Sequence, residues 1–129
     1  TGKIEKGLID LDNSIKQNIT NIPVRFDVII EDASHSLKDQ IISLFLLFKK
    51  INPEGLFIIE ELDFPETRKD MNLKNEKPSL KEIFQKIKKN EYFDSKYISP
   101  EDKKYFLNNF SNIEIYKGNF NEIAIIKKK

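Results

Sequence analysis

Four side chains with the chemistry to bind a cation and move a proton follow two apolar runs of this 129-residue chain. Asp32 and His35 come directly after the first run, and Glu60 and Glu61 close the second. Three carboxylates held together would resist ionisation unless a cation lay between them, and oxygen ligands favour a divalent metal such as Mg²⁺. A nearby imidazole titrates close to neutral pH and can take a proton from a hydroxyl. The pattern predicts a metal site with a general base.

A purely structural interpretation of the same residues stays open when only their positions are considered. Acids that follow strands commonly cap the next helix, and a single histidine near a helix start is often a surface residue. The two interpretations differ in whether the side chains converge, which depends on the elements that carry them.

Those elements are predicted to be a strand, a helix and a second strand. The apolar run Phe26–Glu31 predicts a buried strand, Leu37–Lys50 has helical spacing, and Leu56–Glu61 predicts a second strand. Ser36 and Asp39 form a capping-box-like start for the helix. A helical crossover makes the two strands parallel, so their carboxyl ends meet at one edge of the sheet, where ligands bind in open α/β folds. All four candidate site residues are therefore expected at that edge.

The rest of the chain alternates loops, short helices and a hairpin. Turn residues at Asn52–Gly55 are expected to end the first helix, and the polar stretch 62–78 is expected to be a long loop. A capping box at Ser79 predicts a helix ending near Asn90, and Ser99-Pro100 predicts another. The expected closing hairpin pairs residues 113–116 with 122–126, and the last three lysines are expected to be a solubilising tail.

Composition excludes several classes of function. The net charge is only +1, with 33% charged residues of both signs, so no strong field for nucleic acid is expected. The absence of cysteine excludes disulfides and thiolate catalysis. The most apolar stretch, Ile41–Phe48, is too short to span a bilayer. We expect a cytoplasmic protein without a membrane partner.

A family resemblance strengthens the catalytic interpretation. The residues that carry it are Phe26–Ser36, Asp39-Gln40, Phe45, Leu47-Phe48, Pro53-x-Gly55 and Ile58–Leu62. They resemble the second half of class I S-adenosylmethionine-dependent methyltransferases, in particular the metal-dependent sugar O-methyltransferases that act on glycosylated natural products such as macrolides. The resemblance implies that Asp32, Glu60 and Glu61 hold Mg²⁺ and that His35 is the general base. The family usually has Gly at position 33 and Asp at position 61, where this chain has Ala and Glu.

The same resemblance implies an α/β fold made of part of a Rossmann-like methyltransferase sheet. This part comprises two parallel strands joined by a helix, followed by a C-terminal antiparallel hairpin. The glycines Gly2, Gly7, Gly55 and Gly118 form no Gly-rich nucleotide loop. We therefore expect residues 1–25 to be a remnant of a missing cofactor-binding half and residues 26–129 to be the C-terminal portion. No cofactor-binding residue is assigned, S-adenosylmethionine would need the missing half, and the isolated chain is expected to be inactive.

The expected partner is a small molecule with a hydroxyl acceptor, most simply a sugar, with Arg68 and Lys69 as candidate contacts. Leu8-Ile9 could end a strand, and a short helix could follow Asp12. Because only one neighbour is evident for Phe26–Glu31, that strand is expected to expose an edge. We expect this edge to be covered by the missing half or by a second copy, which favours a homo-oligomer.

Two other functions remain open at this stage. A cephalosporin hydroxylase-like enzyme would keep the fold and the acid-rich edge but act on other small molecules. A non-catalytic half-domain would instead serve as a scaffold that pairs through its strand edge.

Overall fold

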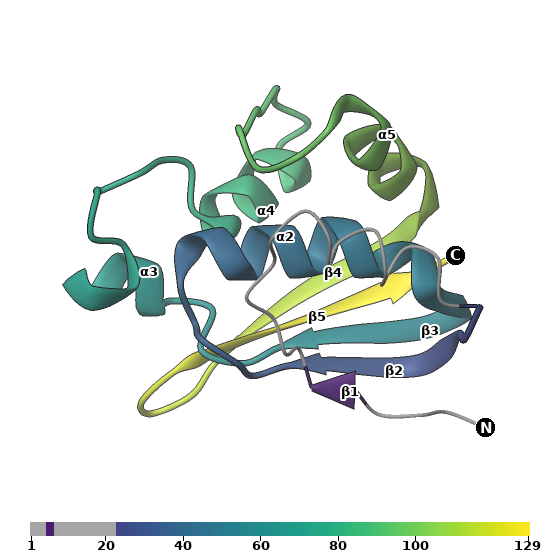
Figure 1. Ribbon diagram of the computed structural model, residues 1–129, viewed down its shortest axis with the longest axis horizontal. Helices are drawn as coiled ribbons and strands as arrows, with labels where there is room; N and C mark the ends of the chain where they lie inside the picture. The colour runs from purple at the N-terminus through teal and green to yellow at the C-terminus, as the bar shows by residue number, and fades with distance from the viewer. Residues whose placement is uncertain (1–4, 7–22) are drawn as a thin grey trace.

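A mixed sheet forms the base of the molecule (Figure 1). The computed structural model describes residues 5–6 and 23–129. In these residues the sheet has five strands in the order β1-β2-β3-β5-β4. The strands are β1 (Glu5–Lys6), β2 (Phe26–Glu31), β3 (Ile51–Ile59), β4 (Phe110–Lys117) and β5 (Glu122–Lys128). β2 is parallel to β1 and β3, whereas β5 is antiparallel to β3 and β4. The predicted α/β class, with a parallel pair and a closing hairpin, is confirmed.

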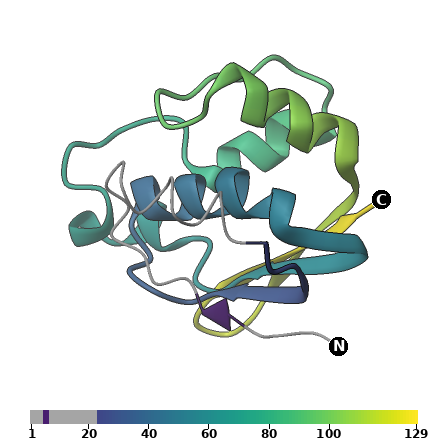
Figure 2. The ribbon, with the colours of Figure 1, turned by 45° about the vertical axis from the view of Figure 1, so that its right-hand side comes forward.

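Helices cover one face of this sheet. They are α2 (Leu37–Leu47), α3 (Phe64–Thr67), α4 (Leu80–Lys88) and α5 (Pro100–Asn109), with 3-10 helices at Phe48–Lys50 and Lys69–Met71. Both views place α2, α4 and α5 on the same side of the strands (Figures 1 and 2). Phe106 of α5 packs against Phe45 and Phe48, with ring centroids 4.9 and 4.8 Å apart. These buried rings join the helical layer to the sheet through Phe57 of β3.

The predicted helix starts are confirmed by their hydrogen bonds. The backbone N–H of Asp39 donates to Ser36 Oγ at 3.2 Å, which satisfies one free donor at the start of α2. At α4 the capping box is complete, because Glu82 N donates to Ser79 Oγ and Ser79 N donates to Glu82 Oε1. These caps fix where each helix begins after its loop.

The break expected at residues 52–55 lies inside β3 rather than before it. The pairing of β2 with β3 shifts between Phe26↔Ile51 and Val28↔Leu56, so the turn residues bulge out of a strand that starts at Ile51. Gly55 is required there, because an added Cβ would lie 2.6 Å from the carbonyl oxygen of Asp27. The sequence correctly predicted that residues 52–55 interrupt the regular structure, but it wrongly placed them before the strand.

The expectation that the chain encodes only one neighbour for β2 is wrong. Glu5 and Lys6 of β1 pair with Ile29 and Ile30, so part of that edge is covered within the same chain. The strand expected at Leu8-Ile9 and the helix after Asp12 lie outside the described residues. Pairing between chains through the Phe26–Glu31 edge, and the homo-oligomer it would form, stay predictions.

One further difference concerns the helical content. The stretch 62–78, expected to be a loop, contains α3 and a 3-10 helix. Within the described residues, no helix is long and apolar enough to cross a membrane.

Two of the three lysines expected to form a tail at the C-terminus, Lys127 and Lys128, are instead part of β5. Lys128 is 5% exposed, and its ammonium donates to the carbonyl oxygen of Ile51 at 2.7 Å and to Tyr105 Oη at 2.6 Å. It also lies 3.3 Å from the carbonyl oxygen of Phe48. One lysine therefore ties the end of β5 to the start of β3, whereas its neighbour Lys127 is exposed.

We expect Lys128→Met to lower the free energy of unfolding by about 1–3 kcal/mol, because it leaves buried carbonyl groups without a donor. Lys127→Met removes the same charge from an exposed position and should change stability by less than about 0.5 kcal/mol. Urea denaturation followed by circular dichroism measures both. Equal stability of the two variants would contradict a structural role for Lys128.

Candidate functional site

The backbone places the predicted site residues at one edge of the sheet. Asp32 follows β2, and Glu60 and Glu61 follow β3, the adjacent parallel strand. The strand ends are held together because Glu60 N donates to the carbonyl oxygen of Glu31 at 3.0 Å. In Figure 1 this edge lies toward the left, near α3 and the β4–β5 turn. The expected common location of the acids is therefore observed, and their roles stay predictions.

His35 lies beside Asp32 in a strained backbone conformation. Its φ is 63°, which a residue with a Cβ adopts rarely and at a cost. Nε2 is 3.7 Å from Asp32 Oδ1, and the ring packs edge-on against Phe64 with centroids 5.4 Å apart. The other ring nitrogen, Nδ1, is buried and has no hydrogen-bond partner. The imidazole is thus held by Phe64 on one side and faces a carboxylate on the other.

Glu61 shares the left-handed conformation, with φ 58°. Its carbonyl oxygen accepts a hydrogen bond from Gln40 Nε2 at 2.9 Å, which links β3 to α2. Its carboxylate accepts from Asn121 Nδ2 at 3.3 Å, in the turn before β5. Neither Gln40 nor Asn121 was predicted from the sequence to be a site residue, because only the fold brings them to this edge.

The donor set has the right chemistry for Mg²⁺ but is not assembled around one point. Carboxylate oxygens are the ligands that hard divalent cations prefer. In residues 23–129, however, no three histidine, aspartate or glutamate side chains are close enough to hold a metal ion. Asp32 and His35 are adjacent, whereas the Glu61 carboxylate is engaged by Asn121. Binding a cation would require side-chain rotation on a backbone that already brings the residues together.

Glu31 is a further acid at this edge, and it was not predicted from the sequence to be a site residue. It is the last residue of β2, 1% exposed, and neither carboxylate oxygen makes a hydrogen bond. Its pKa is raised to about 7, chiefly by burial and to a smaller extent by the nearby charges of Asp39, Asp32 and Glu60, while the backbone N–H of Ala33 lowers it. The alternation of β2, which puts it on the same face as buried Ile29, was the signal that could have identified it.

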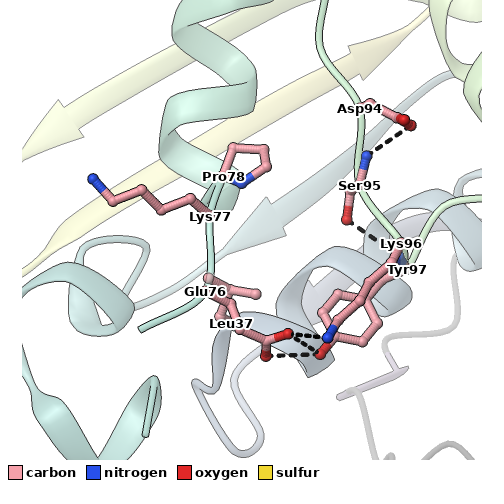
Figure 3. A pocket seen from close by; sticks show the side chains of 8 residues that line it. All are labelled: Leu37, Glu76, Lys77, Pro78, Asp94, Ser95, Lys96 and Tyr97. Atoms are coloured by element: carbon pink, nitrogen blue, oxygen red, sulfur yellow. Dashed lines mark hydrogen bonds and ion pairs between the residues drawn. The ribbon is translucent and has the colours of Figure 1, made fainter. Parts of the chain in front are cut away.

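A pocket of about 300 Å³ opens next to the start of α2 (Figure 3). Its lining residues are Leu37, Glu76, Lys77, Pro78, Asp94, Ser95, Lys96 and Tyr97. The Glu76 carboxylate accepts from the Tyr97 hydroxyl at 2.7 Å and pairs with Lys96 at 2.5 Å. The hydrogen bond from Lys96, followed by that from Tyr97, lowers the pKa of Glu76. Leu37 lies two residues beyond His35 in the chain, whereas none of the four candidate site residues is among those that line the pocket.

Arg68, a candidate contact for a sugar, is already engaged within the chain. It donates to both carboxylate oxygens of Asp70, at 3.2 and 2.8 Å, and its guanidinium lies over the Phe64 ring at 5.1 Å. Because Phe64 also packs against His35, Arg68 is connected to the candidate site through that ring.

The raised pKa of Glu31 predicts how stability changes with pH. In the unfolded chain the carboxyl ionises near pH 4.5, but in the fold it keeps its proton until about pH 7. The folded state therefore binds more protons between these values, and stability falls as the pH rises through them, by about 3 kcal/mol in total.

Glu31→Gln removes this titration, so we expect the variant to match the wild type near pH 4 and to be more stable at pH 8. Urea denaturation across this pH range measures the difference. Glu91→Gln, at an exposed position, is the control and should follow the wild-type profile. A constant difference between Glu31→Gln and wild type at all pH values would show that burial does not perturb Glu31.

No protein-family model matches the sequence, and no curated protein matches it. Solved structures do match. The MycE methyltransferase from the mycinamycin biosynthetic pathway, in complex with Mg and SAH, superposes with a TM-score of 0.59 and 21% sequence identity over 91% of this chain. A second crystal form gives 0.56 at 23% identity, and the complex with Mg, SAH and mycinamycin VI gives 0.55 at 21%.

These matches concern part of a larger protein. The chain covers 29% of MycE in the first and third structures and 30% in the second. At this level of identity the likeness establishes the fold, and it agrees with the element order deduced above. The described residues have a methyltransferase-like α/β fold.

Proposed function

We propose that this chain carries the metal-binding and acceptor-activating part of an S-adenosylmethionine-dependent O-methyltransferase, with Mg²⁺ as its metal and a hydroxyl of a sugar or glycosylated small molecule as acceptor. The observation that carries the proposal is the pair Asp32 and His35, 3.7 Å apart, at the sheet edge that Glu60 and Glu61 share. The fold of MycE, which was solved with Mg and SAH, supports it.

In this proposal Asp32, Glu60 and Glu61 hold the cation. When bound, a divalent cation supplies Lewis acidity that lowers the pKa of a hydroxyl group next to it. Two of the five described non-glycine residues with positive φ, His35 and Glu61, belong to the proposed site, and strained backbone is typical of functional sites. Gln40 and Asn121 hold Glu61 from two sides and would position its strand end.

His35 takes the proton from the acceptor hydroxyl. Nε2 is the ring atom that faces Asp32, so a proton accepted there produces an imidazolium next to a carboxylate. That carboxylate stabilises the charged ring, and the edge-on contact with Phe64 limits the orientations the ring adopts. Methyl transfer from a sulfonium to an alkoxide reduces charge, so the residues at the site have two main tasks, deprotonation and alignment.

The acceptor would lie between His35 and the pocket that begins at Leu37. The Tyr97 hydroxyl, the Glu76 carboxylate and the Lys96 ammonium give this pocket donors and acceptors suited to a hydroxyl-rich ring. The cofactor is assigned to other parts of the enzyme, because no glycine-rich turn is present among the described residues to approach it.

Calorimetric titration of the chain with Mg²⁺ and Mn²⁺ tests the metal site. We expect measurable binding by the wild type, and we expect Asp32→Asn to weaken it by about tenfold or more, because a charged ligand is lost. Asp70→Asn removes an exposed carboxylate that pairs with Arg68 and should leave the affinity unchanged. A wild-type chain that binds neither ion would favour a non-catalytic scaffold.

The role of His35 is tested in a polypeptide that also contains a cofactor-binding half. We expect His35→Ala to lower the rate of methyl transfer by about 10²–10⁴-fold, the usual contribution of a general base, with metal affinity little changed. A panel of glycosides with a labelled methyl donor provides the assay. Unchanged turnover would remove His35 from the mechanism, and failure to methylate any acceptor would favour a different chemistry on the same fold.

A further inference from the structure

A second pocket lies at the edge of the sheet that carries the candidate site. It encloses about 290 Å³ between α3, α4 and the turn that joins β4 to β5. Its lining includes Asp63 and Glu66 at α3, Lys81 of α4, and Phe120 and Glu122 at the turn. Figure 1 shows α3 and this turn at the same end of the sheet.

This pocket adjoins the candidate site through the turn. Asn121, which also lines it, donates from Nδ2 to the Glu61 carboxylate at 3.3 Å. The pocket shares no lining residue with the one that begins at Leu37, so the two are separate cavities.

The polar groups of the pocket are held in place by one another. Glu122 N donates to Asp63 Oδ1 at 2.9 Å, and the Glu122 carboxylate pairs with the Lys81 ammonium at 2.5 Å. The same ammonium lies 4.0 Å from Glu66 Oε1. The hydrogen bond with Glu122 raises the pKa of Lys81, so the ammonium stays charged at neutral pH and acts only as a donor. Donors and acceptors are therefore fixed close together.

The charge of the lining is negative overall. Three carboxylates, those of Asp63, Glu66 and Glu122, line the pocket together with two lysines, Lys81 and Lys117. Juxtaposing like charges costs free energy, so an anionic ligand such as a phosphate is disfavoured here.

Phe120 gives the pocket an apolar surface. The side chain is 93% exposed, the largest value among the large apolar side chains of the described residues. The backbone closes the turn without it, because Gly118 N donates to the carbonyl oxygen of Asn121 at 2.8 Å. A single exposed apolar residue is common on protein surfaces. This one lines a pocket whose other groups form hydrogen bonds, which makes the pocket apolar on one side and polar on the others.

That combination suits a sugar ring. A pyranose carries hydroxyl groups around its edge and C–H groups on its two faces. Carboxylates accept hydrogen bonds from the hydroxyls, an ammonium donates to them, and an aromatic ring packs against a C–H face. Ligand pockets span about 300–1,000 Å³, so this one is at the small end of the range and fits a single ring.

We propose that this pocket is a second subsite for the acceptor and binds one uncharged sugar ring, with Phe120 packed on a C–H face and Lys81 and Glu122 bonded to hydroxyls. This inference rests on the proposed function and adds that the acceptor carries a sugar ring besides the hydroxyl that His35 deprotonates. Because Asn121 connects the pocket to Glu61, the ring is bound next to the strand end of the proposed cation site.

Proton–nitrogen NMR of the whole chain, titrated with the methyl glycosides of glucose, galactose and mannose, tests the subsite. We expect at least one of these probes to shift the backbone amide signals of residues 117–122 in a saturable manner. Phe120→Ala should weaken that binding by about five- to tenfold, because the apolar surface is lost, and Phe120→Tyr should bind like the wild type. Leu73→Ala removes another apolar side chain that is 85% exposed and should leave the affinity unchanged.

Methyl glucuronide tests the charge of the ligand, because it has the ring of methyl glucoside with a carboxylate added. We expect it to bind more weakly than the glucoside by about threefold or more at low ionic strength. Tighter binding of the glucuronide would overturn the assignment of an uncharged ring.

Three other results would overturn the subsite itself. Signals that shift only at residues 94–97 would place the sugar in the pocket that begins at Leu37. Equal affinity of Phe120→Ala and the wild type would remove the aromatic contact, and a wild-type chain that binds none of the glycosides would remove the subsite. Titration of the same sample with Mg²⁺ separates these results from failure of the proposed function, since Asp32, Glu60 and Glu61 do not line this pocket. A chain that binds Mg²⁺ but no glycoside loses only the subsite.

Discussion

The parallel pairing of β2 with β3 is the constraint on which the candidate site depends. Five residue pairs define the register, and the last of them, Glu31 opposite Ile59, fixes which residues leave the sheet together. Because α2 crosses from the end of β2 back to the start of β3, the acids after each strand emerge at the same edge. A slip of one residue would turn the buried side chains of β2 to the opposite face and move Asp32 away from Glu60.

The same constraint brings together groups that repel one another. Backbone and amide contacts hold this edge. Glu60 N donates to the backbone carbonyl oxygen of Glu31, and Gln40 Nε2 donates to the backbone carbonyl oxygen of Glu61. Contacts elsewhere in the molecule offset the repulsion between the acids at this edge. The phenylalanine cluster under α2 and α5 and the buried ammonium of Lys128 lie at the other end of the strands, away from the acids.

The sequence was sufficient for features that depend on local patterns. Helical spacing and the caps at Ser36 and Ser79 predicted α2 and α4, and strand composition predicted the hairpin. Features set by long-range contacts were missed. Lys128 looked like solvated charge, because its partners Phe48 and Ile51 are far away in the chain. The bulge in β3 was mistaken for a strand boundary, since only the pairing with β2 shows that the strand continues through it.

In the candidate site, too, the sequence predicted some features and missed those that depend on long-range contacts. The positions of Asp32, His35, Glu60 and Glu61 followed from strand order, but the environment of each side chain did not. Asn121 reaches Glu61 only because the antiparallel β5 begins where β3 ends, and Phe64 meets His35 only through α3.

The side chains at this edge remain apart for a physical reason. Like charges in a poorly solvated place separate or take up protons unless a counter-charge is present, and Glu61 turns to Asn121 while Glu31 keeps its proton up to about pH 7. The backbone at this edge is fixed by strand pairing, and it has left-handed φ values at His35 and Glu61. A cation arriving here would therefore have to reorganise rotamers but not strands. Under the proposed function, the site would combine a fixed backbone with ligands that come together only when a cation is bound.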